Sequence, residues 1–478
     1  MYSFLGGIIV LLLGYFVYSK VIEKLMDVRG DRETPAYKLQ DGVDYVPMPT
    51  WKVFLIQLLN IAGLGPIFGA LQGALFGPVA FLWVAFGSVF AGGVHDFTSG
   101  VISIKHNGAS LSEIQGIYLG KKIQAVMRIF TIVLLILVGV VFVTGPAKLL
   151  AALTPDKFNT AFWVAVVFVY YFLATILPID VLIGNLYPVF GVCLVIMALG
   201  VGGGIIFEGY RIPEITLTNL HPSHIAVWPM MFITIACGAI SGFHATQSPL
   251  MARCIKNEMY SRKVFYGAMI AEGLIALVWV AAGISFYNGV PQLGAVLTKS
   301  GPGGAVLEIT KTLLGPIGGV LAMLGVIACP ITSGDTAFRG ARIMIADIIH
   351  YKQDKVKKRL LLALPMFAVG IALTFINFDI IWRYFAWANQ TLAMVTLWAV
   401  SVYLVKYKKN HWFTTAPAVF MSAVCTSYIF QAKEGFGLPA VFSNSVGILV
   451  AIGLLGIFLA KAKSFSETIP SIDNSMNV

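Results

Sequence analysis

Five polar side chains lie within a hydrophobic segment that is long enough to cross a bilayer. They belong to the stretch 236–253, ACGAISGFHATQSPLMAR, and are Ser241, His244, Thr246, Gln247 and Ser248. Gly238, Gly242 and Pro249 in the same stretch weaken a helix. Bilayer hydrocarbon offers the backbone no hydrogen-bond partner, so a break survives there only where it faces protein or a wet cavity. We therefore predict a broken helix that forms a binding site, as in many secondary transporters; a kinked helix with packing glycines is the alternative.

A second interruption of the same kind falls in the hydrophobic segment 53–76. The interruption and its flanks comprise Asn60, Ala62, Gly63, Gly65, Pro66, Gly69 and Gln72. The two interruptions are roughly 180 residues and five predicted helices apart, and they run in opposite directions across the membrane. Interrupted helices at corresponding places in two halves indicate an inverted-repeat transporter. A chance pair is the alternative, because glycine is frequent in membrane helices.

Glu272 and Asp335 are carboxyl groups inside predicted spans, where an unpaired charge is costly. Glu272 lies about 12 Å from the predicted start of its helix and has no basic residue within one turn. It is predicted either to carry a proton or to form a structural pair with a neighbouring helix. Asp335 precedes Arg339 by four residues, which permits a local ion pair and keeps Asp335 ionised. The same segment offers a cation the oxygen atoms of Thr332, Ser333, Asp335 and Thr336.

Histidines and amides complete the set of polar groups at membrane depth. His95 and Asp96 lie near one end of the third predicted span, and His244 lies in the second interruption. An imidazole titrates near neutral pH and suits proton coupling, but local hydroxyls can equally satisfy a core histidine. Asn389 and Gln390 either bridge helices or line the cavity, bridging being the commoner role. The pair His221 and His224 has no further ligand nearby, so we expect no metal site.

The composition indicates a helical membrane protein that positions these groups. Hydrophobic residues make up 58% of the 478 residues, charged residues 12%, and the mean hydropathy is +0.84. Hydrophobic segments predict thirteen transmembrane helices, with twelve to fourteen allowed. Their ranges are 2–19, 53–76, 78–104, 129–150, 160–178, 186–207, 229–252, 264–288, 314–338, 360–378, 381–405, 413–431 and 440–461. The N-terminus lacks a basic segment and a cleavage site, and is expected to be a retained helix.

Charge predicts the orientation. With the N-terminus outside, 26 of the 33 Lys and Arg residues lie in inside loops and seven lie outside. The positive-inside rule therefore favours an external N-terminus and a cytoplasmic C-terminus. The same rule explains the net charge of +11 without a nucleic-acid partner. The loop 20–52 is expected to be a cytoplasmic short helix followed by an extended segment, and the outside loops 208–228 and 289–313 are long enough to form lids.

The expected organisation has no soluble domain. A first helix and cytoplasmic segment occupy 1–52, two five-helix repeats occupy 53–207 and 208–405, two further helices occupy 406–463, and a polar tail occupies 464–478. The five cysteines are scattered, and no CxxC occurs, so neither disulfides nor a zinc or iron–sulfur site is predicted. No Walker A or dinucleotide motif is present, no histidine pattern suggests haem, and we expect no enzymatic activity and no cofactor.

Several short motifs together resemble one known family. They are DGVDYVP (41–47), the interruption 62–69, HDF (95–97), SGFHATQSP (241–249), TSGDTAFR (332–339) and ANQ (388–390). Their order and content resemble the carbon starvation protein A family over nearly the whole chain, from about residue 11 to about residue 460. After its histidine the chain reads ATQSPLMAR, where longer members have a run richer in Ser, Thr and Gly, so the substrate does not follow from the resemblance.

The resemblance implies a LeuT-type five-plus-five fold of the amino acid–polyamine–organocation superfamily and bacterial uptake of peptides or, in some members, pyruvate. LeuT-type proteins place a sodium site between the two corresponding helices, which here carry Ala62–Gly65 and Thr332–Thr336. The expected substrate-binding residues are Asn60, Gly63, Gly65, Pro66, Gln72, Gly242, Phe243, His244, Thr246, Gln247, Ser248, Asn389 and Gln390. The expected coupling residues are Ala62, His95, Asp96, Glu272, Thr332, Ser333, Asp335 and Thr336.

These observations predict an ion-coupled symporter in the bacterial inner membrane, with a proton favoured over sodium. A substrate carboxylate is expected at the N-terminus of the half-helix that begins near 246–248, supported by Gln247 and His244. A channel is one alternative, although no repeated filter sequence occurs. A membrane redox subunit is another, which a metal or haem spectrum would reveal. The bilayer and a small-molecule or peptide substrate are the expected partners, and the sequence does not determine the oligomeric state.

Overall fold

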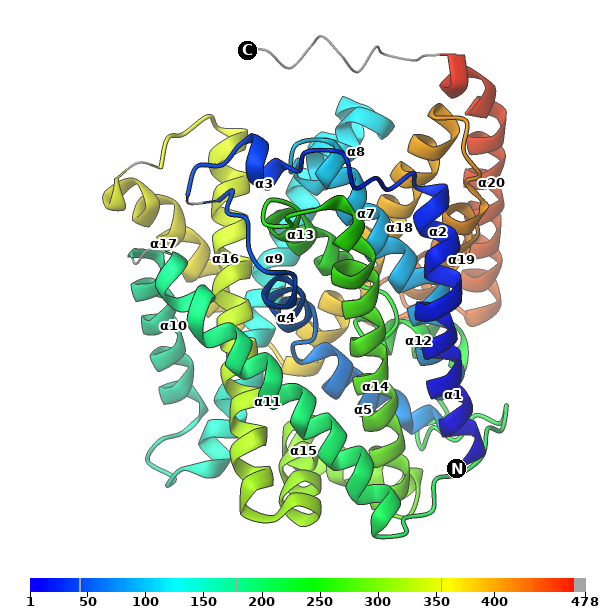
Figure 1. Ribbon diagram of the computed structural model, residues 1–478. Helices are drawn as coiled ribbons and strands as arrows, with labels where there is room; N and C mark the ends of the chain where they lie inside the picture. Colours follow the sequence, from blue (N-terminus) through cyan, green and yellow to red (C-terminus); the bar gives the residue numbers. More distant parts are fainter. Residues whose placement is uncertain (43, 177–178, 354, 468–478) are drawn as a thin grey trace.

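A computed structural model describes residues 1–42, 44–176, 179–353 and 355–467 of the chain (Figure 1). All regular structure in these ranges is helical, apart from one isolated parallel bridge between Met48 and Ile255. The helices form one bundle in which consecutive hydrophobic elements run mostly up and down (Figure 1). The all-helical membrane architecture predicted from composition is therefore confirmed.

Eleven of the helices precede residue 208. They are α1 (Tyr2–Leu13), α2 (Ser19–Leu25), α3 (Pro35–Lys38), α4 (Thr50–Ile61), α5 (Ala70–Gly73), α6 (Ala80–Gly87), α7 (Gly93–Lys105), α8 (Leu111–Leu119), α9 (Lys121–Leu153), α10 (Thr160–Ile176) and α11 (Ile179–Phe207). Short π-helical turns, Gly14–Tyr18, Gly65–Gly69 and Ser88–Gly92, continue α1 into α2, lead into α5, and join α6 to α7. Ser110 and Glu113 form a capping box that starts α8.

Nine helices follow in the second part of the chain. They are α12 (Val227–Thr234), α13 (Gly242–Ala252), α14 (Gly267–Phe286), α15 (Val290–Ala322), α16 (Cys329–Ile348), α17 (Val356–Leu373), α18 (Phe378–Lys406), α19 (Trp412–Gln431) and α20 (Ala440–Glu467). A 3₁₀ turn, Glu258–Tyr260, and a π-helical turn, Arg262–Tyr266, lead into α14, and a π-helical turn, Met323–Ala328, joins α15 to α16.

The helices account for nine to ten membrane spans by length and composition. Nine described helical segments are long and apolar enough to cross a membrane, and the bent pair Thr50–Ile61 and Gly65–Phe76 makes ten. Three of the thirteen predicted spans are not among these ten: α10 is shorter, α12 and α13 are two separate short helices, and α17 does not meet the same measure of length and composition. The exact number of crossings therefore stays a prediction.

Several predicted boundaries differ from the structure. Helix α11 begins at Ile179, so the loop expected at 178–186 is helical over its described part. Helix α20 continues to Glu467, past the expected end at 461, and residues 468–478 of the expected tail lie outside the described ranges. Positive φ angles at Gly301 (68°) and Gly315 (60°) divide α15 into three pieces, so its apolar length is not one straight span. The ninth predicted span accordingly starts at the second of these kinks and continues into α16.

The segment between α2 and α4, which we call the strap and which is described at residues 26–42 and 44–49, crosses one end of the bundle (Figure 1). It holds the short helix α3, and its other described residues form turns and irregular chain, whereas the sequence predicted a short helix followed by an extended segment. Thr34 Oγ1 donates to the carbonyl of Ile255 at 2.7 Å, and the amide of Met48 donates to the carbonyl of Cys254 at 3.0 Å. The strap is therefore fixed to the chain that follows α13.

Candidate functional site

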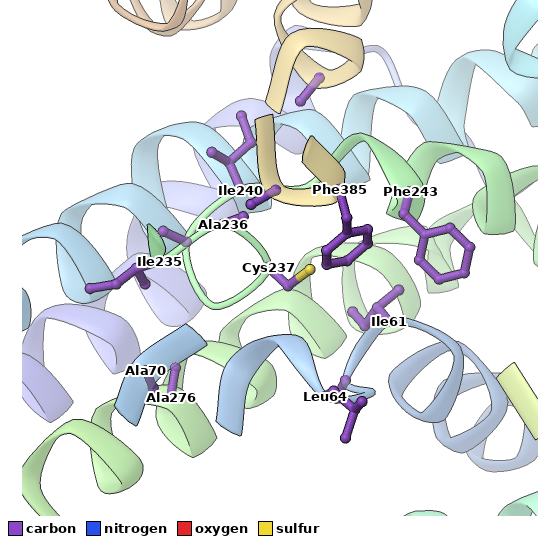
Figure 2. Packing of buried hydrophobic residues seen from close by; sticks show 14 of the residues in the cluster. Ile61, Leu64, Ala70, Ile235, Ala236, Cys237, Ile240, Phe243, Ala276 and Phe385 are labelled. Carbon is purple, nitrogen blue, oxygen red and sulfur yellow. The ribbon is translucent and has the colours of Figure 1, made fainter. Parts of the chain in front are cut away.

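The two interrupted helices lie against each other at their breaks. A Cβ atom placed on Gly65 would lie 2.2 Å from Cβ of Cys237, and one placed on Gly238 would lie 3.6 Å from Cα of Pro66. Figure 2 shows the same approach, with Ile61 and Leu64 on one side and Ala236, Cys237 and Ile240 on the other. The axes of the first pair of half-helices are bent by 53°. Glycine is required at Gly65 because the neighbouring chain occupies the space of a side chain.

The second break lies earlier than the sequence suggested. Helix α12 ends at Thr234, and α13 begins at Gly242 and continues through Pro249. His244, Thr246, Gln247 and Ser248 are therefore helical, and the expected half-helix start at 246–248 is wrong. The hydroxyl groups of Thr246 and Ser248 donate to carbonyls of their own helix, those of Phe243 at 2.7 Å and His244 at 3.0 Å. The helix can include Thr246 and Ser248 because their hydroxyl groups find partners in the backbone carbonyls of the preceding turn.

Asn389 and Gln390 of α18 hold the two halves of this broken helix. Asn389 Oδ1 accepts a hydrogen bond of 2.8 Å from the amide of Phe243 in the first turn of α13. The Gln390 amide donates to the carbonyl of Phe232 in α12. The bridging interpretation of these two residues therefore fits the structure. Asn389 thereby occupies part of the actual N-terminus of α13, four residues before the half-helix start near 246–248 at which a substrate carboxylate was predicted.

Four fully buried ionisable side chains form one chain of contacts beside the break. His95 Nδ1 lies 2.8 Å from Asp96 Oδ1, and His244 Nδ1 lies 2.9 Å from Asp96 Oδ2. On its other side, His244 Nε2 lies 3.3 Å from Glu272 Oε2. All four side chains are 0% exposed. Helices α7, α13 and α14 thus bring together residues that the sequence presents up to 177 positions apart.

The contacts constrain where protons lie in this cluster. An ionised Asp96 has no donor, so each histidine must present Nδ1–H toward it. The Nε2 atom of His244 then faces Glu272 either as a donor from a cationic imidazole or as an acceptor from a protonated carboxyl. One proton is shared by the His244–Glu272 contact in both cases. The 3.3 Å separation is within ion-pair range, although its angles do not meet hydrogen-bond geometry.

Asp335 lies in a different environment. Arg339 Nη2 lies 3.2 Å from Asp335 Oδ2 and 3.0 Å from the carbonyl of Ala174 in α10. Thr332 and Ser333 both donate to the carbonyl of Cys329, at 2.7 and 3.1 Å, and Thr336 donates to that of Thr332 at 3.2 Å. The local ion pair expected from the i,i+4 spacing is therefore present. Asp335 is turned toward α10 by this pair and is not part of the His95–Glu272 cluster.

The remaining predicted residues surround the first break. Ala62 ends α4 with non-helical dihedral angles, and a Cβ atom on Gly63 would lie 2.8 Å from the Phe142 ring. Phe142 also packs edge-on against Phe243 at 6.2 Å between ring centroids. Several amide atoms in this part of the structure are buried without a hydrogen-bond partner. They are Asn60 Oδ1, Gln72 Nε2 and Gln247 Oε1.

Two residues near the breaks, Gln57 and Cys237, were not among those predicted from the sequence. Gln57 in α4 is 0% exposed, and neither atom of its amide group has a hydrogen-bond partner. Its place inside a hydrophobic span, three residues before Asn60, was a signal available in the sequence. Cys237 meets Gly65 and accepts a contact from Asn389 at 3.6 Å, which only the folded chain reveals. In the described ranges, no three His, Cys, Asp or Glu side chains are placed to hold a metal ion.

Comparison with known proteins relates the whole chain to membrane transporters, without detail on single residues. The family model for carbon starvation protein CstA matches residues 1–157, 147–300 and 304–428. An uncharacterized membrane protein of Haemophilus influenzae is 43% identical over 58% of this chain and 89% of its own length. The peptide transporter CstA of Campylobacter jejuni is 25% identical and covers 95% of this chain and 83% of its own length. The pyruvate/proton symporter BtsT of Escherichia coli is 28% identical, over 61% of this chain and 51% of its own length.

A solved structure shares the fold. The crystal structure of the Eremococcus coleocola manganese transporter superposes with a TM-score of 0.57 and 15% identity, over 89% of this chain and 99% of that one. At this identity the likeness concerns the arrangement of helices alone. The chain therefore has the helical architecture of a membrane transporter.

Proposed function

The chain belongs to the carbon starvation protein CstA family, and from that premise we propose that it is a proton-coupled symporter that imports short peptides or small carboxylates such as pyruvate. Relatives are named as a peptide transporter and as a pyruvate/proton symporter, which supports this range of substrates. The observation that carries proton coupling is the buried chain from His95 through Asp96 and His244 to Glu272.

The cluster is suited to proton coupling because of its position as well as its chemistry. His244 lies in the first turns of α13, directly after the second break, whereas Glu272 lies on the neighbouring α14. Movement of α13 relative to α14 would change the His244–Glu272 separation and hence the affinity of this contact for its proton. Substrate bound at the breaks would therefore be linked to protonation through the position of one helix.

We also propose that the chain contains an inverted five-plus-five repeat in which the two broken helices are the corresponding first members. We further propose that it lies in the bacterial inner membrane. The contact between Gly65 and Cys237 supports the pairing of the two breaks. Sodium is the second candidate for the coupling ion, because Thr332, Ser333 and Thr336 supply hydroxyl oxygens on α16. The Asp335–Arg339 pair weakens this candidate, since it already neutralises the carboxylate nearest to those hydroxyls.

Uptake into proteoliposomes tests the proposal. The purified protein is reconstituted, and labelled pyruvate and a labelled dipeptide are offered with a pH gradient alone, a sodium gradient alone, or neither. We expect accumulation of one of these compounds above its external concentration only with the pH gradient. Accumulation that requires sodium would refute proton coupling, and equilibration without accumulation would favour a channel. A haem or metal absorption band in the pure protein would favour a redox subunit.

A further inference from the structure

A groove on the side of the bundle lies apart from the buried cluster. It has a volume of about 650 Å³ and lies between the α1–α2 junction, α6, α12 and α19. Its floor is an aromatic triad in which the rings of Trp83, Phe232 and Phe420 are 4.9 to 5.6 Å apart. Gly87, Ala91 and Ala416 line it with small side chains, which leave the hollow open.

The groove faces the hydrocarbon of the membrane. Phe86, Phe90 and Trp412, which line it, are 46%, 43% and 52% exposed, as expected of apolar side chains on a surface that faces lipid. The lining residues along α6 and the following turn extend from Val79 to Ala91, about 18 Å by helical rise. One leaflet of a bilayer contributes about 15 Å of hydrocarbon. The length of the groove therefore matches a chain that belongs to one leaflet.

One end of the groove is aromatic and basic. Tyr18 and Trp412 lie there, and both residue types favour the membrane interface. Exposed lysines follow or precede them closely in the chain: Lys20, Lys24 and Lys408. The neighbouring acids are already paired, Glu23 with Arg262 at 3.0 Å and Asp27 with Arg29 and Arg32 at 3.0 and 2.8 Å. This end therefore presents free positive charge where a lipid headgroup would lie.

We propose that the groove binds an acyl chain of an anionic phospholipid whose headgroup lies beside Lys20, Lys24 and Lys408. A helix from a second copy of the chain is the competing occupant. A groove of about 650 Å³ holds only part of a helix about 10 Å wide, and a helix docked there by one face would bring no anionic group to the three lysines. An acyl chain also explains the lysines at one end, because it carries its anionic group there.

The groove would be linked to transport through two side chains of its floor, Trp83 and Phe232. Trp83 Nε1 donates a hydrogen bond of 3.0 Å to the carbonyl of Ile235, the first residue of the second break. Phe232 of the triad lies on α12, and its carbonyl accepts from Gln390. A lipid in the groove therefore contacts the half-helix that leads into the break, and its occupancy affects the position of that half-helix.

The amount of lipid that the purified protein retains tests whether the groove binds an anionic phospholipid. The protein in neutral detergent micelles is titrated with phosphatidylglycerol or with phosphatidylcholine of the same acyl chains, and bound lipid is counted by native mass spectrometry. We expect one tightly retained phosphatidylglycerol per chain and at least tenfold weaker retention of phosphatidylcholine. Ala416→Trp fills the groove from its exposed side and should abolish retention. Ala165→Trp makes the same change at an exposed position of α10 and should leave retention unchanged.

The charged end has its own test. Combined Lys20→Gln, Lys24→Gln and Lys408→Gln substitutions should remove the preference for phosphatidylglycerol, whereas Lys121→Gln, Lys122→Gln and Lys357→Gln at other exposed sites should not.

Equal retention by the Ala416→Trp and Ala165→Trp variants would overturn the proposal. So would an Ala416→Trp protein that keeps its lipid but loses a dimer, because the groove would then be an interface between copies. In unaltered protein, brominated phosphatidylglycerol should quench tryptophan fluorescence more than brominated phosphatidylcholine; equal quenching would also contradict the proposal.

Discussion

Asp96 has a central position among the buried ionisable side chains, because it contacts two histidines that lie on different helices. Its two oxygens lie 2.8 Å from His95 and 2.9 Å from His244. With both oxygens occupied by imidazole donors, Asp96 has little to gain from a proton of its own. The exchangeable proton is thereby directed to the other end of the cluster, between His244 and Glu272. This makes Glu272 the side chain whose substitution is most informative.

Glu272→Gln should retain substrate exchange and lose accumulation driven by a pH gradient. Glutamine has the shape of the protonated carboxyl but cannot release a proton, so the substrate cycle continues without proton transfer. Counterflow of labelled substrate and net uptake under a pH gradient are measured in the same proteoliposomes. Glu208→Gln, at an exposed end of α11, is the matched control. If Glu272→Gln still concentrates substrate under a pH gradient, coupling must be assigned to Asp335 or His244.

Asp335→Asn should reduce uptake, while the dependence of uptake on the pH gradient remains.

His244→Ala should weaken uptake and also lower stability. Truncation leaves Asp96 and Glu272 buried without their shared partner, and removal of one member of a buried pair costs about 3 kcal/mol or more. The thermal midpoint in detergent should therefore fall measurably, whereas His224→Ala in an exposed loop should leave it unchanged. Unchanged transport and stability in His244→Ala would remove His244 from the site.

At the scale of the elements, the break that follows α4 packs closely against the break that precedes α13. Gly65→Ala should destabilise the protein by about 2 kcal/mol, because the new Cβ would lie 2.2 Å from Cβ of Cys237. Cys237→Gly removes that atom, so the double variant should regain much of the loss. Gly6→Ala on α1 is the control, since a Cβ atom placed on Gly6 would have no neighbour within 4 Å. Additive losses in the double variant would show that the two breaks do not meet.

The strap provides a second element whose attachment can be tested. Thr34→Val removes the buried hydrogen bond to the carbonyl of Ile255 and should loosen the strap without unfolding the bundle. Trypsin should then cleave faster at Arg29, Arg32 and Lys38. Thr154→Val, which removes a hydroxyl far from the strap, should not change these rates. Unchanged cleavage in Thr34→Val would mean that other contacts hold the strap.

Asp27 adds a pH dependence to the same attachment. Burial alone would raise the pKa of Asp27, but hydrogen bonds from Arg29 and Arg32 outweigh it and lower the pKa. A lowered pKa means that the contribution of Asp27 is complete above the ordinary carboxyl value near 4 and is lost as the pH falls through the lowered value. Hydrogen exchange in the strap should therefore rise only below about pH 4. Asp27→Asn should show the faster exchange at pH 7 as well; equal exchange in both proteins at pH 7 would contradict this role.

The sequence predicted which helices break but not where the second one breaks. Glycine, proline and polar residues between 236 and 253 indicate an interruption, yet they are compatible with several positions for it. The position is decided by Asn389, which binds the amide of Phe243 from a helix far along the chain. Likewise, His95, Asp96, His244 and Glu272 were each candidates from their type and depth. Their convergence depends on the rotation and packing of three helices, which residue spacing within one helix does not determine.

For the whole molecule, the distribution of basic residues predicts the orientation in the membrane. The strap, α8 and the end of α20 lie toward one end of the bundle, whereas the N-terminus and α15 lie toward the other (Figure 1). The loops assigned to the first end hold 26 of the 33 Lys and Arg residues. Since loops with excess positive charge stay on the cytoplasmic side, the end that carries the strap should face the cytoplasm.

Labelling of single introduced cysteines from outside the cell measures this orientation. Lys299→Cys in α15 and Lys433→Cys after α19 should react with a membrane-impermeant maleimide in intact spheroplasts. Lys357→Cys and Asn410→Cys, near the other end, should react only after the membrane is permeabilised. The unaltered protein gives the background, which should be low because Cys237, Cys254, Cys329 and Cys425 are buried and Cys193 is only partly exposed. The reverse pattern would invert the orientation and place the strap outside. Labelling of all four positions without permeabilisation would instead show that neither the segment between Lys299 and Lys357 nor α19 crosses the membrane.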